Sequence, residues 1–204
     1  MTRESRAARA LLVTACTFVV VLQPRPASAH LVTTGLGPVY DGISHVFMSP
    51  DDLVPIIALS LLAGLNGSAA ARSALFALTG AWLVGGILGF VGGAPLLPTA
   101  SVTGSFLLLG TLTAIDRRLS PPVVAVLAVL VGLTHGWLNG VSLAQAQREG
   151  IGLAGIASAA FVVVAIASAL VVSIRIPWAR IAVRVAGSWV AAIGLLMLGW
   201  SLRR

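Results

Sequence analysis

The chain has 204 residues, of which 58% are hydrophobic and 9% are charged, and its mean hydropathy is +1.02. A soluble domain carries about 25% charged residues, so the composition excludes a soluble globular protein and indicates an integral membrane protein. All 13 basic residues are Arg, and the absence of Lys excludes retinal and pyridoxal Schiff-base chemistry. The sequence pI of about 11.7 does not indicate nucleic-acid binding, because the Arg residues form no stripe with aromatic residues.

Residues 1–29 have the pattern of a cleavable secretory signal peptide. A positive segment with Arg3, Arg6 and Arg9 precedes an apolar run over 10–22, and Ala-Ser-Ala at 27–29 is an A-x-A cleavage site. A helix rises 1.5 Å per residue, so this run is too short to cross a hydrocarbon core of about 30 Å. An uncleaved first anchor is the alternative. Cleavage removes Cys16, the single cysteine, and with it thiolate metal sites and Cys nucleophiles.

Six apolar blocks follow, each close to the roughly 20 residues that a helical span requires. The sequence therefore predicts an all-α, polytopic membrane protein with six transmembrane helices over residues 30–204. The first block carries Pro55 early, which predicts a kink or partial insertion. The predicted blocks are 51–66, 73–92, 96–115, 121–139, 151–174 and 179–201.

The distribution of Arg predicts the orientation in a bacterial plasma (inner) membrane. An exported, mature N-terminus outside the cytoplasm places the loops after the first, third and fifth spans inside. Six Arg residues then lie on the inner side and three on the outer side, in agreement with the positive-inside rule. The inner set is Arg72, Arg117, Arg118, Arg175, Arg180 and Arg184, and the outer set is Arg148, Arg203 and Arg204.

The few polar groups near the spans fall into two clusters, and intramembrane ionisable residues are functional candidates by default. The first cluster precedes and opens the first span, with Asp41, His45, Asp51 and Asp52. The second ends the fourth span, where His135, Asn139 and Ser142 are spaced to share one helix face. Both clusters are predicted at the outer face or just inside it.

Structural roles compete with function at several of these positions. Ser49-Pro50-Asp51-Asp52 has the pattern of a helix start with a capping box, which favours a capping role for Asp52 and leaves Asp51 as the functional acid. Glycines at 132, 136 and 140 form a small-xxx-small pattern that predicts close helix packing. The five Trp residues, Trp82 among them, are interpreted mainly as interfacial anchors.

Imidazole and carboxylate ligands without thiolate suit a borderline divalent ion such as nickel, cobalt, zinc, iron or copper. We expect such an ion as transported cargo, with no tightly bound cofactor. The candidate metal ligands are His45, Asp51, His135, Asp41, Asp52 and Asn139.

At these two clusters the chain resembles the HupE/UreJ family, small membrane proteins encoded with nickel hydrogenases and ureases and regarded as nickel permeases. Members have a signal peptide, about six spans, a motif H-x5-D-H opening the first span and a His-Gly motif in the fourth. His45 and Asp51 match the first motif, and Asp52 stands where its closing His is usual. His135-Gly136 matches the second, while Asn139 and Ser142 replace a usual His and Glu.

The resemblance favours a secondary transporter for a divalent metal, nickel or cobalt before others, with an outer-face His/Asp site. No Walker motif is present, so ATP does not drive it directly. The leading alternative is a non-transporting membrane assembly factor for a metalloenzyme such as hydrogenase or urease. We do not expect an enzyme: no G-x-S-x-G elbow occurs and no Ser is tied to a His by spacing. Axial haem ligation by His45 and His135 is a weaker alternative.

The expected partners are the lipid bilayer and the metal ion, not nucleic acid, and a homo-oligomer is left open.

Overall fold

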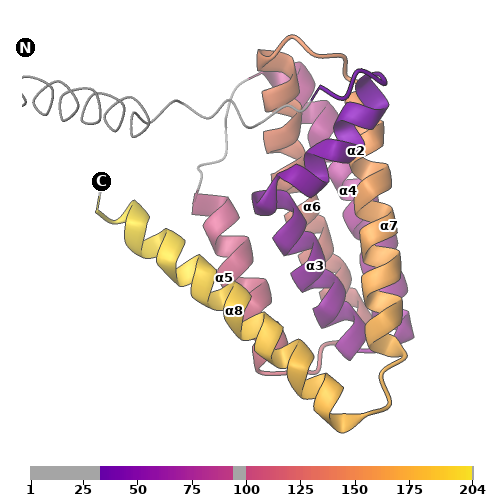
Figure 1. Cartoon of the computed structure of the whole chain (residues 1–204), viewed down its shortest axis with the longest axis vertical. Coiled ribbons are helices and arrows are strands. Elements are labelled where there is room, and N and C mark those ends of the chain that lie inside the picture. The colour runs from indigo at the N-terminus through magenta and orange to yellow at the C-terminus, as the bar shows by residue number, and fades with distance from the viewer. Residues whose placement is uncertain (1–32, 94–99, 204) are drawn as a thin grey trace, which may run out of the picture. The chain divides into compact units, whose positions relative to one another are not determined.

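A computed structural model describes residues 33–93 and 100–203. The predicted signal peptide and its cleavage site lie outside these residues. Within them the chain forms helices and no strand, which confirms the all-α prediction. The helices are α2 (Pro38–Met48), α3 (Pro50–Leu65), α4 (Ser68–Gly92), α5 (Ala100–Ala114), α6 (Pro121–Gln145), α7 (Gly152–Val172) and α8 (Pro177–Ser201) (Figure 1).

The six predicted apolar blocks coincide with helices α3 to α8, but their lengths differ from the prediction. Among the described residues, four helices are long and apolar enough to cross a membrane: α4, α6, α7 and α8. A fifth span results if α2 and α3 are counted together, and α5 is a shorter apolar helix of 15 residues. Six spans therefore stay a prediction, whereas a multi-helix membrane architecture is established.

Helices α2 and α3 are separated by a sharp break and meet at an angle of 74°. The break falls at Ser49, whose backbone is extended (φ −108°, ψ 92°). Pro50 causes it, because a proline ring disfavours helical geometry in the preceding residue and supplies no N–H to the preceding helix. The sequence predicted irregularity at Pro55, but Pro55 lies inside α3.

Glycines allow α4 and α6 to pack with their backbones in close approach. A Cβ added at Gly132 would lie 2.6 Å from the Leu78 carbonyl oxygen, and one at Gly136 would clash with the carbonyl of Trp82. The contact is reciprocal, because a Cβ at Gly85 on α4 would lie 2.5 Å from the carbonyl oxygen of Leu133. The small-xxx-small prediction is thus confirmed, with α4 as the partner of α6.

Similar close approaches hold α2 against α7. A Cβ at Gly42 would meet the Gly152 carbonyl oxygen, and one at Gly155 would meet that of Val39. Helix α5 packs along α8, and α3 contacts both α5 and α7. These contacts fix the break between α2 and α3 against the neighbouring helices.

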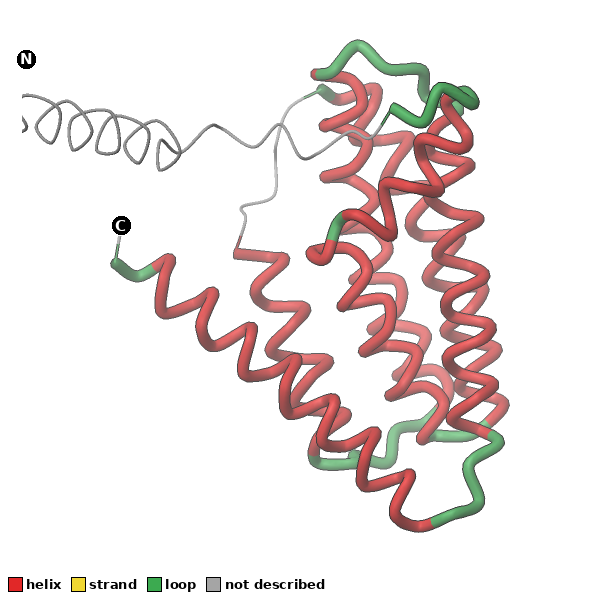
Figure 2. Tube along the Cα trace, viewed as in Figure 1, coloured by secondary structure: helices red, strands yellow, loops and turns green. Residues whose placement is uncertain are grey.

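The loops that the sequence assigned to one side of the membrane lie at one end of the helices (Figure 2). The Asn66 side-chain oxygen accepts a hydrogen bond from the Leu119 N–H at 2.6 Å. The Arg180 guanidinium bonds both oxygens of Asp116, at 2.8 and 2.7 Å. We call this the Asp116 end, and the opposite end, with the loop between α6 and α7, the Arg148 end.

Candidate metal site around Asp52

Asp52 occupies the first turn of α3, directly after the break, and only 5% of it is exposed. Its carboxylate faces three side chains from other parts of the chain. His135 Nδ1 lies 2.9 Å from Oδ1, the Asn139 amide donates to Oδ2 at 2.9 Å, and His45 Nε2 lies 3.4 Å from Oδ2. Asp52 therefore joins α2, α3 and α6 at one buried point.

This placement corrects the capping role that the sequence favoured for Asp52. Helix α3 does begin at Pro50 after Ser49, as predicted, but Ser49 makes no side-chain capping bond. Its hydroxyl lies instead 3.3 Å from His45 Nδ1. Within the first turn, the N–H of Asp52 donates to the Ser49 carbonyl at 3.0 Å. The Asp52 side chain is thereby left to bond across the helices.

The predicted alignment of His135 and Asn139 on one face of a helix is confirmed. Both are buried on α6, and the Asn139 amide also donates to the His135 carbonyl at 2.8 Å. Residues four apart on a helix lie one above the other, so one carboxylate can reach both. The register of α6 therefore positions two of the partners of Asp52.

His135 is fully buried, and two further residues enclose it. The Ser105 hydroxyl on α5 lies 3.1 Å from His135 Nε2. The ring of Trp82 on α4 lies 5.5 Å from the imidazole, centroid to centroid, at an interplanar angle of 32°. Trp82 is fully buried, so its interpretation as an interfacial anchor is wrong. Sequence spacing gave no signal for Ser105, 30 residues from His135.

Ser105, His135 and Asp52 have the order hydroxyl, imidazole, carboxylate found in hydrolase triads. The structure thus ties a Ser to a His, which spacing did not predict. However, Ser105 is buried, and its hydroxyl lies 2.7 Å from the Val102 carbonyl, to which it donates. A nucleophile needs access to substrate, so this arrangement suits orientation of the His135 ring rather than attack by Ser105.

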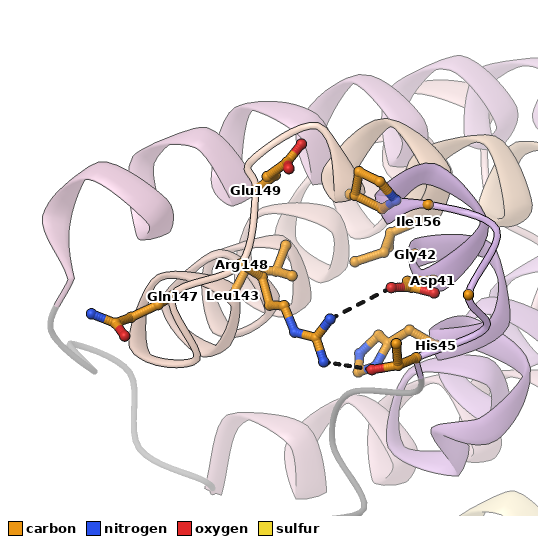
Figure 3. A pocket seen from close by; sticks show the side chains of 13 residues that line it. Asp41, Gly42, His45, Leu143, Gln147, Arg148, Glu149 and Ile156 are labelled. Carbon is orange, nitrogen blue, oxygen red and sulfur yellow. Dashed lines mark hydrogen bonds and ion pairs between the residues drawn. The ribbon is translucent and has the colours of Figure 1, made fainter.

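A cavity of about 370 Å³ lies at the Arg148 end, next to His45 (Figure 3). Asp41 lines it one helical turn from His45 on α2. The Asp41 carboxylate accepts hydrogen bonds from the Thr34 N–H and hydroxyl, at 2.6 and 2.7 Å. Arg148 NH1 lies 3.6 Å from its other oxygen. His45 therefore borders both this cavity and the Asp52 cluster.

Of the six predicted ligands, the structure brings four together: His45, Asp52, His135 and Asn139. Asp41 shares the cavity with His45, and the side chain of Asp51 is exposed on α3. Over residues 33–93 and 100–203, no three His, Cys, Asp or Glu side chains are arranged to hold a metal ion. The side chains of His45, His135 and Asn139 instead contact the Asp52 carboxylate directly.

Comparison with known proteins identifies the chain's relatives. The family model for HupE / UreJ proteins matches residues 17–197. The protein HupE of Rhizobium leguminosarum bv. viciae is 28% identical over 184 residues, which cover 89% of this chain and 95% of that protein. No solved structure matches. With its several membrane-length apolar helices, the chain is a multi-pass membrane protein that belongs to the HupE / UreJ family.

Proposed function

We propose that the protein is a secondary permease for a divalent transition-metal ion, nickel or cobalt before others. The observation that carries the proposal is the buried Asp52 carboxylate, placed at a break between two helices and facing His45 and His135. Transporters place substrate sites at discontinuous helices, and a buried intramembrane acid is a functional candidate by default. The family's association with nickel hydrogenase and urease accessory function supports the choice of metal.

The chemistry of the cluster favours a borderline dication. Its groups supply imidazole nitrogen, carboxylate oxygen and amide oxygen, and these suit nickel and cobalt better than calcium or magnesium. For a cation to bind, the hydrogen bond between His135 and Asp52 and the contact between His45 and Asp52 open. The cation then takes the place of the N–H donors on the carboxylate. Such exchange is compatible with transport, because it permits both binding and release.

The test is uptake of nickel, cobalt, zinc and copper by cells with and without the protein, after confirmed membrane insertion. We expect accumulation of nickel or cobalt with the wild-type chain and its loss with His45→Gln and His135→Gln. Ser60→Ala is the matched control, because Ser60 is fully buried but its hydroxyl bonds only the Ile56 carbonyl on its own helix.

Unchanged contents of all four metals contradict transport. If metalloenzyme maturation failed in the same cells, that result would favour the assembly-factor alternative.

A further inference from the structure

The cavity at the Arg148 end holds opposite charges in contact. Asp41, His45, Arg148 and Glu149 all line it. Arg148 extends from the loop after α6 toward Asp41 on α2 (Figure 3). Its second guanidinium nitrogen donates to the Thr33 hydroxyl at 2.6 Å. One side chain therefore connects the α6–α7 loop to the segment before α2.

The ion pair between Arg148 and Asp41 is loose compared with another pair in the same chain. Only one guanidinium nitrogen is within ion-pair range of Asp41, at 3.6 Å, and the Arg148 side chain is 38% exposed. The Arg180–Asp116 pair is bidentate, at 2.8 and 2.7 Å. A monodentate, partly solvated pair contributes little free energy, so a competing cation can displace Arg148 from Asp41.

From this geometry we propose a second cation site in the cavity, formed by Asp41 and His45, in which Arg148 acts as a tethered competitor. This inference rests on the proposed function, because the divalent metal ion that we take as the ligand is the ion proposed to be transported. Asp41 and His45 lie four residues apart on α2, so their side chains are neighbours on one face. His45 also reaches Asp52, so an ion bound here lies next to the buried cluster.

The volume of the cavity fits a hydrated ion. Six water molecules occupy about 180 Å³ at their share of liquid volume, roughly 30 Å³ each, against a cavity of about 370 Å³. A cation can therefore keep most of its water here, with Asp41 supplying charge and His45 a nitrogen ligand. Arg148 weakens this site in two ways, because it occupies Asp41 and repels a second positive charge.

The test is Ni²⁺ titration of the purified full-length chain in lipid nanodiscs, followed by calorimetry. The Ni²⁺ affinity is measured in two backgrounds, the wild-type chain and Asp52→Asn. The Asp52→Asn background weakens binding at the buried cluster. Arg148→Gln removes the competing charge and is expected to tighten Ni²⁺ binding about fivefold, the scale of a partly exposed ion pair. Arg148→Lys keeps the charge and stays near the wild-type affinity.

The Asp41→Asn change is expected to abolish this tightening when combined with Arg148→Gln. Arg180→Gln is the control, since it breaks an ion pair at the other end of the helices. Far-UV circular dichroism, which measures helix content, checks that each variant is folded. Unchanged or weaker binding with Arg148→Gln, or tightening that persists without the Asp41 charge, overturns the proposal. Because this assay needs no transport, absent uptake with a tightened Arg148→Gln variant would reject the permease and keep the site.

Discussion

Two adjacent acids, Asp51 and Asp52, have opposite environments. Asp51 is exposed, whereas Asp52 is buried and bonded to side chains of α2 and α6. Successive residues on a helix point about 100° apart, so only one of the pair can face α6. The sequence motif identified both acids, but the same residues also fit a helix cap. Which of the two acids faces α6 depends on how α3 is rotated about its axis.

A first prediction compares these neighbours. Asp52→Asn places an amide N–H₂ among groups that donate hydrogen bonds, so we expect the free energy of unfolding to fall by about 1–3 kcal/mol. Asp51→Asn changes an exposed side chain and is expected to stay within about 0.5 kcal/mol. Denaturant unfolding in mixed micelles measures both. Equal effects of the two substitutions would contradict the burial of Asp52 in the cluster.

A second prediction concerns the hydroxyl beside His135. Ser105→Ala leaves His135 Nε2 buried without this partner, which is expected to cost about 1 kcal/mol of stability. Ser60→Ala removes a hydroxyl that bonds only its own helix, where the backbone carbonyl keeps its helical partner, and is expected to cost less. Denaturant unfolding in mixed micelles measures the stability of both variants. A larger loss of stability for Ser60→Ala than for Ser105→Ala would argue against a role for Ser105.

Part of the site could be predicted from the sequence because its ionisable residues are rare. His45, His135 and Asn139 were identified from their rarity and helical spacing, and they meet at Asp52. Ser105 and Trp82 could not be found in this way. Ser is common at helix interfaces in membranes and Trp at the membrane–water interface, so neither residue type indicated this site. Only the packing of α4 and α5 against α6 brings these two to His135.

At the scale of elements, the glycine contact between α4 and α6 sets how closely these helices approach. Gly85 and Gly80 both lie on α4, but only Gly85 faces α6: an added Cβ would lie 2.5 Å from the Leu133 oxygen, whereas at Gly80 it meets nothing within 4 Å. The spacing of glycines predicted this contact, since backbone approach requires small residues.

The third prediction follows from this pair of positions. Gly85→Ala forces the two backbones apart and is expected to destabilise the protein by about 1–3 kcal/mol. Gly80→Ala fills open space and is expected to be neutral or to stabilise by up to about 1 kcal/mol, through helix propensity. Thermal unfolding of the two variants measures the difference, and matching midpoints would rule out tight packing at Gly85.

The break between α2 and α3 could be anticipated only in part. Both Pro50 and Pro55 were visible in the sequence, and a kink was expected at Pro55. Proline acts most strongly on the residue before it and on the preceding turn. For Pro50 that turn is the end of α2, so the helix stops at Met48. Pro55 follows only one turn of α3, where few helical hydrogen bonds are lost.

The fourth prediction concerns pH and the ion pair at the Asp116 end. Hydrogen bonds from Arg180 lower the pKa of Asp116 below its ordinary value of 3.8, against a smaller effect of burial that raises it. A carboxyl group with a lowered pKa in the folded state stabilises the protein above the unfolded pKa. This contribution is lost as the pH falls through the folded pKa.

The wild-type chain is therefore expected to be more stable than Asp116→Asn at neutral pH, by less than about 1 kcal/mol for so exposed a pair. The difference should shrink below pH 3.8. Unfolding midpoints of both proteins between neutral and acidic pH test this. A difference that grows on acidification has the wrong sign for this ion pair.

For the whole molecule, hydropathy predicted the class and the positions of the helices well. Runs of apolar residues between charged or Pro-containing loops correspond to α3 to α8, because a helix satisfies its own backbone hydrogen bonds within a hydrocarbon layer. Hydropathy did not determine the number of membrane spans. Helix α5 has 15 residues and α3 has 16, and hydropathy alone does not reveal that α2 and α3 meet at 74°.

The outward-facing apolar residues also agree with a membrane environment. Large side chains are exposed along α8, among them Trp189 at 72% and Leu196 at 75%, whereas the polar residues His135, Asn139 and Asp52 are buried. A protein that folds in lipid places its apolar groups outward and satisfies its polar groups inside. The buried cluster is therefore the feature that the proposed function must explain.

Uptake of nickel and cobalt in cells that express the wild-type chain, His135→Gln and Ser60→Ala tests that function most directly. The proposed permease function predicts that wild-type and Ser60→Ala cells accumulate one of these metals above cells without the protein, and that His135→Gln cells do not. Equal metal contents in all four kinds of cell, with each protein inserted in the membrane, would contradict it.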